Sequence, residues 1–311
     1  MTSPASLPLV SILIPTHNRP DYLEIALKSA LAQTYENIEI IVSDNSDDEL
    51  SLERLAPYRA AHPNIHYFRS IGATATENGR ICLDHATGEF VNYLMDDDVH
   101  LPTKISRMMH YFLTLPEIGL VTSSRQLIDK DGNFLPAAPA TQRLVEVDSR
   151  INGTALGDIV LTNGKNVIGE PTTVLLRRAD ILAGFGQFCG RQYFALSDVA
   201  TWLSILADRD CVYLPEALSH FRMHPNQDQR NTSVVINAQI EWMHLILDGH
   251  LGKHFLLDRA LLRERLVALV VSFLNFLETN QAQIRASGKD VEAIQTIFRQ
   301  AVEVMLTDPE L

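Results

Sequence analysis

Cysteine and surplus positive charge are both scarce in this sequence of 311 residues. The three cysteines, Cys82, Cys189 and Cys211, stand far apart and form no C-x-x-C pair, which argues against a disulfide framework and against a zinc knuckle. With 26 Lys and Arg against 38 Asp and Glu, the formal net charge is −12. Since proteins that bind nucleic acid need an excess of basic residues to neutralise phosphates, no nucleic-acid partner is expected.

Long apolar runs are lacking as well. The longest, Leu266 to Leu277, is interrupted by Ser272 and Asn275 and is too short to span a bilayer. Residues 1–8 have no basic stretch followed by an apolar one, so no export signal is expected. Together these absences predict a cytoplasmic protein. Peripheral association at the inner face of the membrane stays open, with the amphipathic C-terminal segment as the candidate anchor.

Short apolar runs alternate with helical patterns through the first hundred residues. Runs rich in β-branched residues predict strands over 9–14, 38–43, 65–68 and 89–95, and helical spacing predicts helices over 20–31, 50–61 and 78–86. Strands that alternate with helices imply a mostly parallel sheet flanked by helices on both faces. The predicted fold class is therefore α/β.

The rest of the chain changes character near residue 230. Further strands are predicted over 119–124, 171–176 and 211–214. From about Val234 to Leu306, large apolar residues recur at three- and four-residue spacing, which predicts a small helical subdomain. A packed helical bundle or a homodimer interface explains this periodicity, and we favour these over a membrane anchor.

Polar loops follow three of the predicted strands. They are Pro15–Arg19, Asp44–Asp48 and Asp96–Asp98. In open parallel sheets, ligands bind outside the carboxyl ends of the strands. We therefore expect the three loops to converge on one edge of the sheet and to form a single site.

The third loop consists of three consecutive carboxylates, which repel one another unless a cation neutralises them. Mg²⁺ and Mn²⁺ favour carboxylate oxygens and typically bridge to substrate phosphates. Asp96 and Asp98 are spaced to approach one metal from a turn, while Asp97 is free to face the nucleotide sugar or the backbone. The alternative interpretation is a solvated acidic turn, or a cap for a helix that starts near Pro102.

Four segments, in order, resemble the family 2 glycosyltransferases with the GT-A fold, a Rossmann-like and mostly parallel sheet. They are residues 10–20 (VSILIPTHNRP), 27–35 (LKSALAQTY), 39–45 (EIIVSDN) and 94–98 (LMDDD). The match runs in order through about Pro225. The resemblance implies a GT-A domain over 1–230, with a nucleotide-binding half over about 1–100 and an acceptor half over about 101–230. The helical subdomain then occupies 231–311.

The resemblance also implies roles for the residues of the donor half. Asp44 matches the second-strand aspartate that hydrogen-bonds the base, usually uracil. Asp96 and Asp98 match the D-x-D pair, in which the last aspartate holds Mn²⁺ or Mg²⁺ on the diphosphate. The implied nucleotide contacts are Pro15, Thr16, His17, Asn18, Arg19, Asp44, Asn78, Arg80, Asp96 and Asp97.

Later matches concern catalysis and the acceptor. Asp198 lies where the family carries its catalytic base, although the family often has Glu-Asp there and this chain has Ser197-Asp198. Its alternative role is an N-terminal helix cap. Glu170, Arg222 and His224 are candidate contacts for the diphosphate or the acceptor, with purely structural roles as the alternative.

The predicted function is an inverting, metal-assisted sugar transfer from a nucleotide-diphosphate donor, UDP-linked by the resemblance at Asp44, to a hydroxyl acceptor in cell-surface polysaccharide or glycoconjugate synthesis. A sugar-phosphate nucleotidyltransferase would need a glycine-rich basic loop after the first strand, which the sequence lacks. A catalytically silent nucleotide-sugar-binding or scaffolding relative is the other alternative. Intact Asp96, Asp98 and Asp198 argue against it. The donor sugar and the acceptor are not readable.

Overall fold

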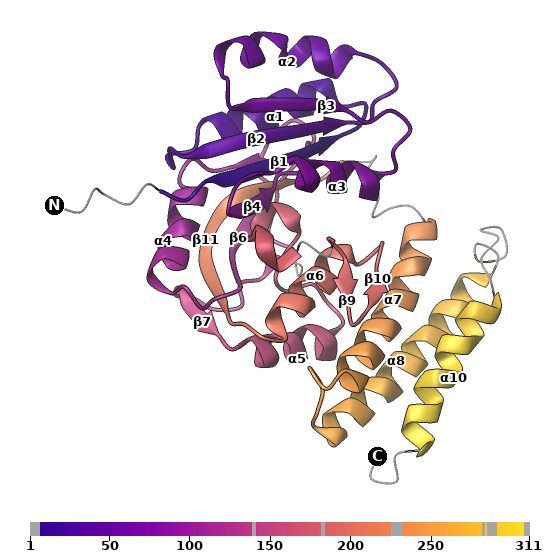
Figure 1. The fold of residues 1–311 in the computed structure, drawn as a ribbon. Helices are drawn as coiled ribbons and strands as arrows, with labels where there is room; N and C mark the ends of the chain where they lie inside the picture. The colour runs from indigo at the N-terminus through magenta and orange to yellow at the C-terminus, as the bar shows by residue number, and fades with distance from the viewer. Residues whose placement is uncertain are drawn as a thin grey trace. The chain divides into compact units, whose positions relative to one another are not determined.

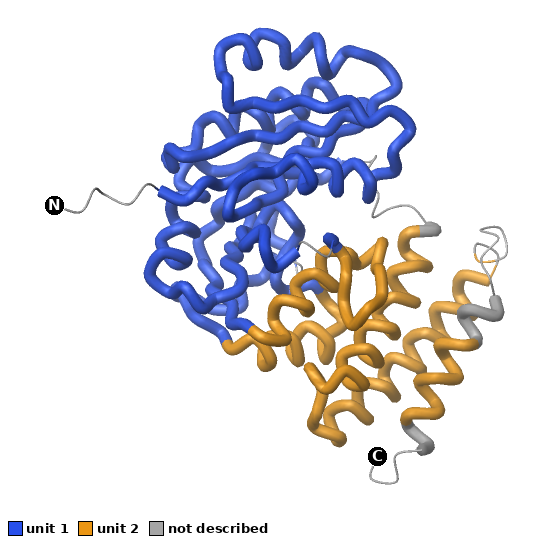
Figure 2. The backbone as a smooth tube through the Cα atoms, in the orientation of Figure 1, with its two compact units in different colours: residues 1–151, 166–185, 209–224 blue, residues 152–165, 186–208, 225–311 orange. Residues whose placement is uncertain are grey.

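The structure is a computed structural model that describes residues 7–138, 141–181, 184–224, 232–281, 284 and 291–307. The chain divides into two compact units, which Figure 2 distinguishes by colour. Unit 1 comprises residues 1–151, 166–185 and 209–224, and unit 2 comprises residues 152–165, 186–208 and 225–311.

A mostly parallel sheet forms the centre of unit 1 (Figure 1). Its strand order is β3-β2-β1-β4-β8-β6-β11-β5, and β7 pairs with β11. The strands are β1 Val10–Thr16, β2 Ile38–Asp44, β3 Ile65–Arg69, β4 Phe90–Tyr93, β5 Val99–His100, β6 Leu120–Ile128, β7 Ser149–Ile151, β8 Leu175–Arg177 and β11 Cys211–Arg222. Strands β1 to β4 are parallel, as are β6 and β11, whereas β5, β7 and β8 run antiparallel to their neighbours. The predicted α/β class is confirmed.

Helices cover both faces of this sheet. They are α1 Pro20–Leu31, α2 Leu50–Ala61, α3 Ala75–His85 and α4 Lys104–Thr114, with short 3₁₀ turns η2 at Pro171–Thr173 and η3 at Arg178–Ile181. Alternate residues of β1, Val10, Ile12 and Ile14, are buried in the core that includes Leu27 of α1 and Met108 of α4. Helix α3 covers the opposite face, where the Cys82 thiol lies 3.8 Å from the carbonyl oxygen of Ile41.

Three predicted elements differ from the observed ones for local reasons. Helix α3 begins before residue 78 because Thr74 and Glu77 form a reciprocal capping box. The predicted strand over 171–176 splits into η2 and β8, since the Thr173 amide bonds back to Glu170 O. Strand β11 continues beyond residue 214 because a register shift around Pro215 lets it keep pairing with β6.

Unit 2 contains the helices predicted for the C-terminal part of the chain. Its elements are α5 Gly153–Asn163, β9 Gln187–Phe188, β10 Arg191–Gln192, α6 Ser197–Leu206, α7 Thr232–Leu251, α8 Arg259–Thr279 and α10 Val291–Thr307. Within the described part of the chain, we find no helix with the length and apolarity needed to cross a membrane.

The linear domain boundary predicted at residue 230 does not follow these units, because internal segments join unit 2. Helix α5 is tied to the C-terminal part by the Leu256 amide, which donates to Asp158 (2.7 Å), and by the Arg265 side chain, which donates to Leu161 O (2.8 Å). The existence of a C-terminal helical part could be read from periodicity, whereas this long-range recruitment of 152–165 and 186–208 could not.

A buried carboxylate, Glu39, ties β2 to β1 and to the turn before β4. It accepts hydrogen bonds from the Ser11 hydroxyl (2.6 Å), the Thr87 amide and hydroxyl (2.6 and 2.9 Å) and the Gly88 amide (3.0 Å). Burial alone would raise its pKa, but these hydrogen bonds favour the ionised form more strongly and lower the pKa of Glu39.

Replacing this carboxylate should weaken the sheet. We expect Glu39→Gln to destabilise the protein at pH 7 by about 1.5–3 kcal/mol, the range for hydrogen bonds to charged groups. Because the folded-state pKa is depressed, this stability is present above the unfolded-state pKa and disappears as the pH falls through the folded-state value. Urea unfolding at several pH values measures it, with exposed Glu36→Gln as the control. Equal midpoints for Glu39→Gln and wild type at pH 7 would contradict this assignment.

Candidate functional site

The loops after β1, β2 and β4 meet through direct hydrogen bonds, as their positions at strand ends predicted. The Thr16 hydroxyl donates to Asp96 Oδ2 at 2.8 Å. The Asn78 side-chain amide, from α3, donates to Thr16 O and to Asn45 Oδ1, both at 3.1 Å. Asn78 is therefore a buried connector between the first two loops, and the first loop contacts the aspartates directly.

Asn18 joins the β1 loop to the β2 loop through three hydrogen bonds. Its backbone has a positive φ of 53°, a conformation that Asn tolerates better than most residues. Its amide donates to Ser46 Oγ at 2.7 Å, its side chain donates to Asp47 Oδ2 at 2.7 Å, and the Asp47 amide donates back to Asn18 Oδ1 at 3.0 Å. These bonds fix the relative position of the two loops.

Asp44 is fully buried at the end of β2. Its Oδ1 accepts the Ser46 amide at 2.8 Å, while its Oδ2 accepts the Tyr67 hydroxyl and lies 3.3 Å from Arg69 Nη1. Burial, with a contribution from the Asp44 carboxylate, raises the pKa of Tyr67. Sequence analysis missed Tyr67 and Arg69. The signal available was the predicted parallel sheet, because the strands over 38–43 and 65–68 then end at the same edge.

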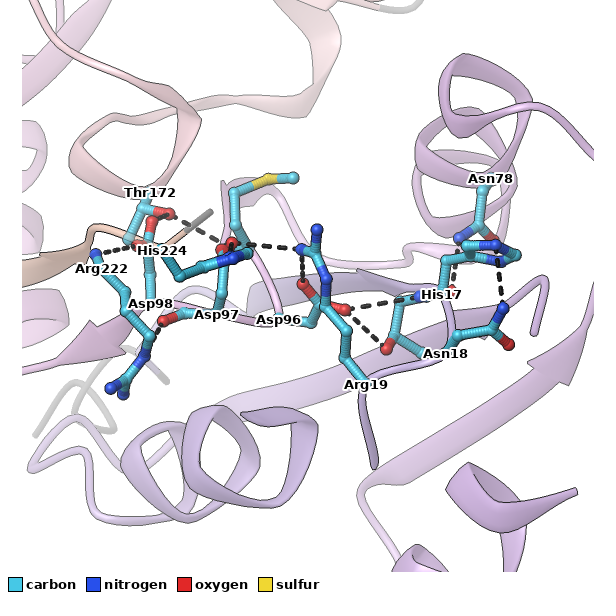
Figure 3. Close-up of polar contacts among 12 residues, drawn as sticks. His17, Asn18, Arg19, Asn78, Asp96, Asp97, Asp98, Thr172, Arg222 and His224 are labelled. Carbon is cyan, nitrogen blue, oxygen red and sulfur yellow. Dashed lines mark hydrogen bonds and ion pairs between the residues drawn. The ribbon is translucent and has the colours of Figure 1, made fainter. Parts of the chain in front are cut away.

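Asp96 and Asp97 share one cation, the guanidinium of Arg19 (Figure 3). Arg19 Nη1 lies 3.1 Å from Asp96 Oδ1 and 3.1 Å from Asp97 Oδ2. On its other side, Asp97 Oδ2 lies 2.9 Å from His224 Nε2. Asp97 is thus held between Arg19, just before α1, and His224, just after β11, whereas Asp96 shares only Arg19 with it.

Asp98 is held by neutral donors. Thr172 donates its hydroxyl to Asp98 Oδ2, and the backbone amide of Arg222 donates to Asp98 Oδ1 at 3.0 Å. Figure 3 shows Thr172 and Arg222 flanking this carboxylate. Thr172 was not singled out from the sequence, because its segment was predicted as a strand and its role depends on a contact 74 residues away.

Buried groups beneath the site fix the turn that carries Thr172. The Asn92 side chain donates to the carbonyls of Thr172 (3.3 Å) and Val174 (2.6 Å), and Lys104 Nζ donates to Thr173 O at 2.9 Å. Burial lowers the pKa of Lys104 to about 7. These contacts hold the backbone of the turn so that the Thr172 hydroxyl can donate to Asp98.

The electrostatics of the cluster follow from burial. Burial raises the pKa of Asp96 to about 6, and the neighbouring Asp97 adds to the shift while Arg19 opposes it. Burial and Asp97 also raise the pKa of Asp98, against the Thr172 hydrogen bond. Both ionised forms are costly here, so the cluster has room for additional positive charge.

The donor set of this cluster fits a metal that is shared with a substrate. Within the described ranges, no group of three or more His, Cys, Asp or Glu side chains is arranged to enclose a metal ion. Mg²⁺ and Mn²⁺ need no such enclosure, because one or two carboxylates and substrate phosphates suffice. The oxygens of Asp96 and Asp98 retain lone pairs beyond those used by Thr16 and Thr172, so they can supply those carboxylates.

The remaining predicted residues of unit 1 lie in different settings. Arg222 is 3% exposed and donates hydrogen bonds to the backbone carbonyls of residues 97, 129 and 130. Its guanidinium stacks 4.7 Å above the Tyr22 ring.

Glu170 forms an ion pair with Arg125 at 2.9 Å. Arg80 is exposed and pairs with Asp84 at 3.5 Å, so the structure does not bring it to the aspartates. His17 Nδ1 lies 3.0 Å from Asn45 O, and Pro15 pairs with Ser43 in the β1–β2 register.

Asp198 belongs to unit 2, in the first turn of α6. The N-cap residue of α6 is Leu196, so Asp198 is not the cap, although an acidic residue in the first turn suits the positive end of a helix. Glu241 of α7 accepts the amides of Phe194 (3.0 Å) and Leu196 (2.7 Å) and so fixes the approach to this turn. Nothing in the sequence around Glu241 pointed to that role.

Comparison with known proteins gives a consistent result. Residues 11–179 match the family model described as "Glycosyl transferase family 2". An uncharacterized glycosyltransferase of Rickettsia typhi is 33% identical over 248 residues, which cover 79% of this chain and 72% of the relative. A GalNAc(5)-diNAcBac-PP-undecaprenol beta-1,3-glucosyltransferase of Campylobacter jejuni is 35% identical over 130 residues, 41% of each chain. Relatives from Rickettsia bellii, Rickettsia felis and Rickettsia conorii are much longer, and the matched segment covers only 19 to 21% of their length.

Solved structures share the fold. S. aureus TarS 1–349 in complex with UDP-GlcNAc superposes with a TM-score of 0.60 at 16% identity, covering 94% of this chain and 79% of that one. The mannosyltransferase PcManGT from Pyrobaculum calidifontis, in complex with GDP-Man and Mn²⁺, gives a TM-score of 0.57 at 16% identity, covering 97% and 82%. The fold is GT-A, as the sequence resemblance implied.

The cost of the buried aspartates can be measured in the absence of metal. We expect Asp98→Asn to raise the thermal midpoint in EDTA at pH 8, since it removes a desolvated charge next to Asp97, while its amide oxygen can accept from the Arg222 amide and its NH2 group can donate to the Thr172 hydroxyl oxygen. An increase of about 1 kcal/mol in the free energy of unfolding corresponds to a rise of about 2–4 °C in the thermal midpoint for a protein of this size. Exposed Asp131→Asn is the control. A lower midpoint for Asp98→Asn would show that the ionised carboxylate stabilises the fold.

Proposed function

Because the chain belongs to glycosyltransferase family 2, we propose that it transfers one sugar from a UDP-linked donor to a hydroxyl acceptor, with inversion and with the help of a divalent metal. One observation carries this proposal: hydrogen bonds join the three strand-end loops around buried carboxylates, and burial raises the pKa of Asp96 and Asp98. A nucleoside diphosphate with its metal would supply positive charge together with a ligand for the loops.

The donor's nucleoside is assigned to the β1 and β2 loops. Asp44, with Tyr67 and Arg69 around it, offers polar groups for a base, and Thr16 to Arg19 lead from there to the aspartates. UDP is the proposed nucleotide because of the sequence resemblance at Asp44 and because TarS was solved with UDP-GlcNAc. PcManGT was solved with GDP-Man, so a guanine nucleotide is the competitor to test.

The diphosphate and its metal are assigned to the aspartates. Asp98, assisted by Asp96, would hold Mn²⁺ or Mg²⁺, which when bound stabilises the negative charge of the departing diphosphate. Arg19 and His224, both in contact with Asp97, are the nearby basic side chains. Glu170 and Arg222 already engage protein groups, so we assign them to supporting the site.

Proton transfer is assigned to Asp198. Its carboxylate would accept the proton of the acceptor hydroxyl as that oxygen bonds to the anomeric carbon and the bond to the diphosphate breaks. Glu241 would keep the Asp198 turn in place through the amides of 194 and 196. The acceptor is proposed to be a cell-surface polysaccharide or glycoconjugate intermediate, since one relative is named for a lipid-linked saccharide.

Several finer points belong to the same proposal. They are a cytoplasmic location, peripheral association at the inner face of the membrane, and a homodimer formed through the C-terminal helices.

Nucleotide binding tests the donor site. We expect UDP with Mn²⁺ to raise the thermal midpoint more than GDP with Mn²⁺ does, and much more than UDP in EDTA. At a UDP concentration of 100 times Kd, ligand binding adds about 2.7 kcal/mol to stability. If no nucleotide raises the midpoint with or without metal, the donor-site assignment fails.

The assignment of the base predicts a separation of binding from turnover. Asp198→Asn should bind UDP and Mn²⁺ like wild type but release UDP from a UDP-sugar about 10²–10⁴-fold more slowly, the usual contribution of a general base. Exposed Asp208→Asn, just beyond α6, is the control and should turn over normally. Retained turnover in Asp198→Asn would remove Asp198 as the base, and slow turnover in wild type itself would favour a silent binding protein.

A further inference from the structure

Arg19 occupies a position that a diphosphate-bound cation would also need. Its Nη1 contacts both Asp96 Oδ1 and Asp97 Oδ2 at 3.1 Å, and its side chain is 28% exposed while those carboxylates are 5% and 12% exposed. The guanidinium therefore lies over the open side of a buried anionic pair. Figure 3 shows it reaching to the aspartates from the β1 loop.

The loss of Arg19 would affect the three aspartates unequally. Among the ion pairs of the described chain, Asp96 pairs with Arg19, whereas Asp97 pairs with both Arg19 and His224. Asp98 is bonded to Thr172 and to a backbone amide. If the guanidinium moved away, Asp97 would keep its contact with His224, whereas Asp96 would keep its hydrogen bonds from two neutral donors, the Thr16 hydroxyl and the His17 amide.

A metal ion and this guanidinium compete for the same carboxylate. Two cations beside one oxygen repel each other, and the repulsion is strong where water is excluded. A metal that binds Asp96 must therefore displace Arg19 from that carboxylate, and the Arg19–Asp96 ion pair is then lost. A nucleoside diphosphate changes this balance, because a guanidinium binds phosphate oxygens with two parallel hydrogen bonds.

We propose that Arg19 is an internal counter-ion of the aspartate cluster, which a metal–diphosphate complex displaces and then recruits as a phosphate ligand. The inference rests on the proposed function, since it assumes a diphosphate at this site. Its consequence is that metal and nucleotide bind cooperatively: Mn²⁺ alone binds weakly, and UDP tightens it. Arg19 thereby prevents the protein from taking up a metal ion without its donor.

Manganese binding tests the proposal without turnover. Free Mn²⁺ is measured by electron paramagnetic resonance for wild type, Arg19→Met and Arg19→Lys, each with and without UDP. In wild type, UDP should tighten Mn²⁺ binding at least about tenfold, within the usual range of coupling between sites. Arg19→Met should bind Mn²⁺ alone about tenfold more tightly than wild type and should lose most of that coupling. Arg19→Lys, which keeps the charge but not the planar fork, should lie between them.

The control is Arg54→Met, which removes the ion pairs from Arg54 on α2 to Asp21 and Glu24 on α1 and should leave Mn²⁺ binding unchanged. Equal affinities of wild type and Arg19→Met for Mn²⁺ alone would overturn the inference, and so would a loss of Mn²⁺ binding in folded Arg19→Met. If Arg19→Met does not fold, absence of coupling in wild type overturns it equally. Failure of the proposed function looks different, because wild type would then bind no Mn²⁺ even with UDP.

Discussion

Buried negative charge at the carboxyl end of β4 is the constraint around which unit 1 is organised. Three carboxylates lie there with exposures of 3, 9 and 1%. Groups from three distant segments converge on them: Thr16 and Arg19 from the β1 loop, Thr172 from η2, and the end of β11 through His224 and the Arg222 amide. Each contact reduces the cost of the buried charge, but the raised pKa of Asp96 and Asp98 shows that the compensation is incomplete. This deficit is what a cationic ligand would remove.

Hydrogen bonds also hold the β1 and β2 loops together in the absence of any ligand. Asn78 joins the β1 and β2 loops from α3, and Asn18 joins them from within. Beneath them, the buried carboxylate of Glu39 holds the opposite end of β1 to the turn before β4. A site held in this way loses little conformational entropy on binding, so more of the contact energy appears as affinity. The unliganded protein is destabilised in return, because its buried carboxylates are removed from water.

Much of this could be predicted from the sequence, because alternation of strands and helices dictates which loops share a sheet edge. The convergence of 15–19, 44–48 and 96–98 needed no more than that rule. Thr172, Tyr67 and Arg69 escaped prediction, since their roles depend on side-chain contacts between strands and turns that no local pattern encodes. Arg80 and Asn78 show what sequence position alone does not give: helix phase leaves Arg80 exposed beside Asp84, while Asn78 two residues earlier faces the loops.

The central claim is that the aspartate cluster and the strand-end loops form one site for a metal-bound nucleoside diphosphate. A crystal structure of the protein with UDP and Mn²⁺ tests it most directly. We expect uracil within hydrogen-bonding distance of the Asp44 region, Mn²⁺ between the diphosphate and Asp98, and the Arg19 guanidinium moved from Asp96 to phosphate oxygens. A nucleotide bound away from these loops, or a Mn²⁺ ion that touches none of the three aspartates, would contradict it.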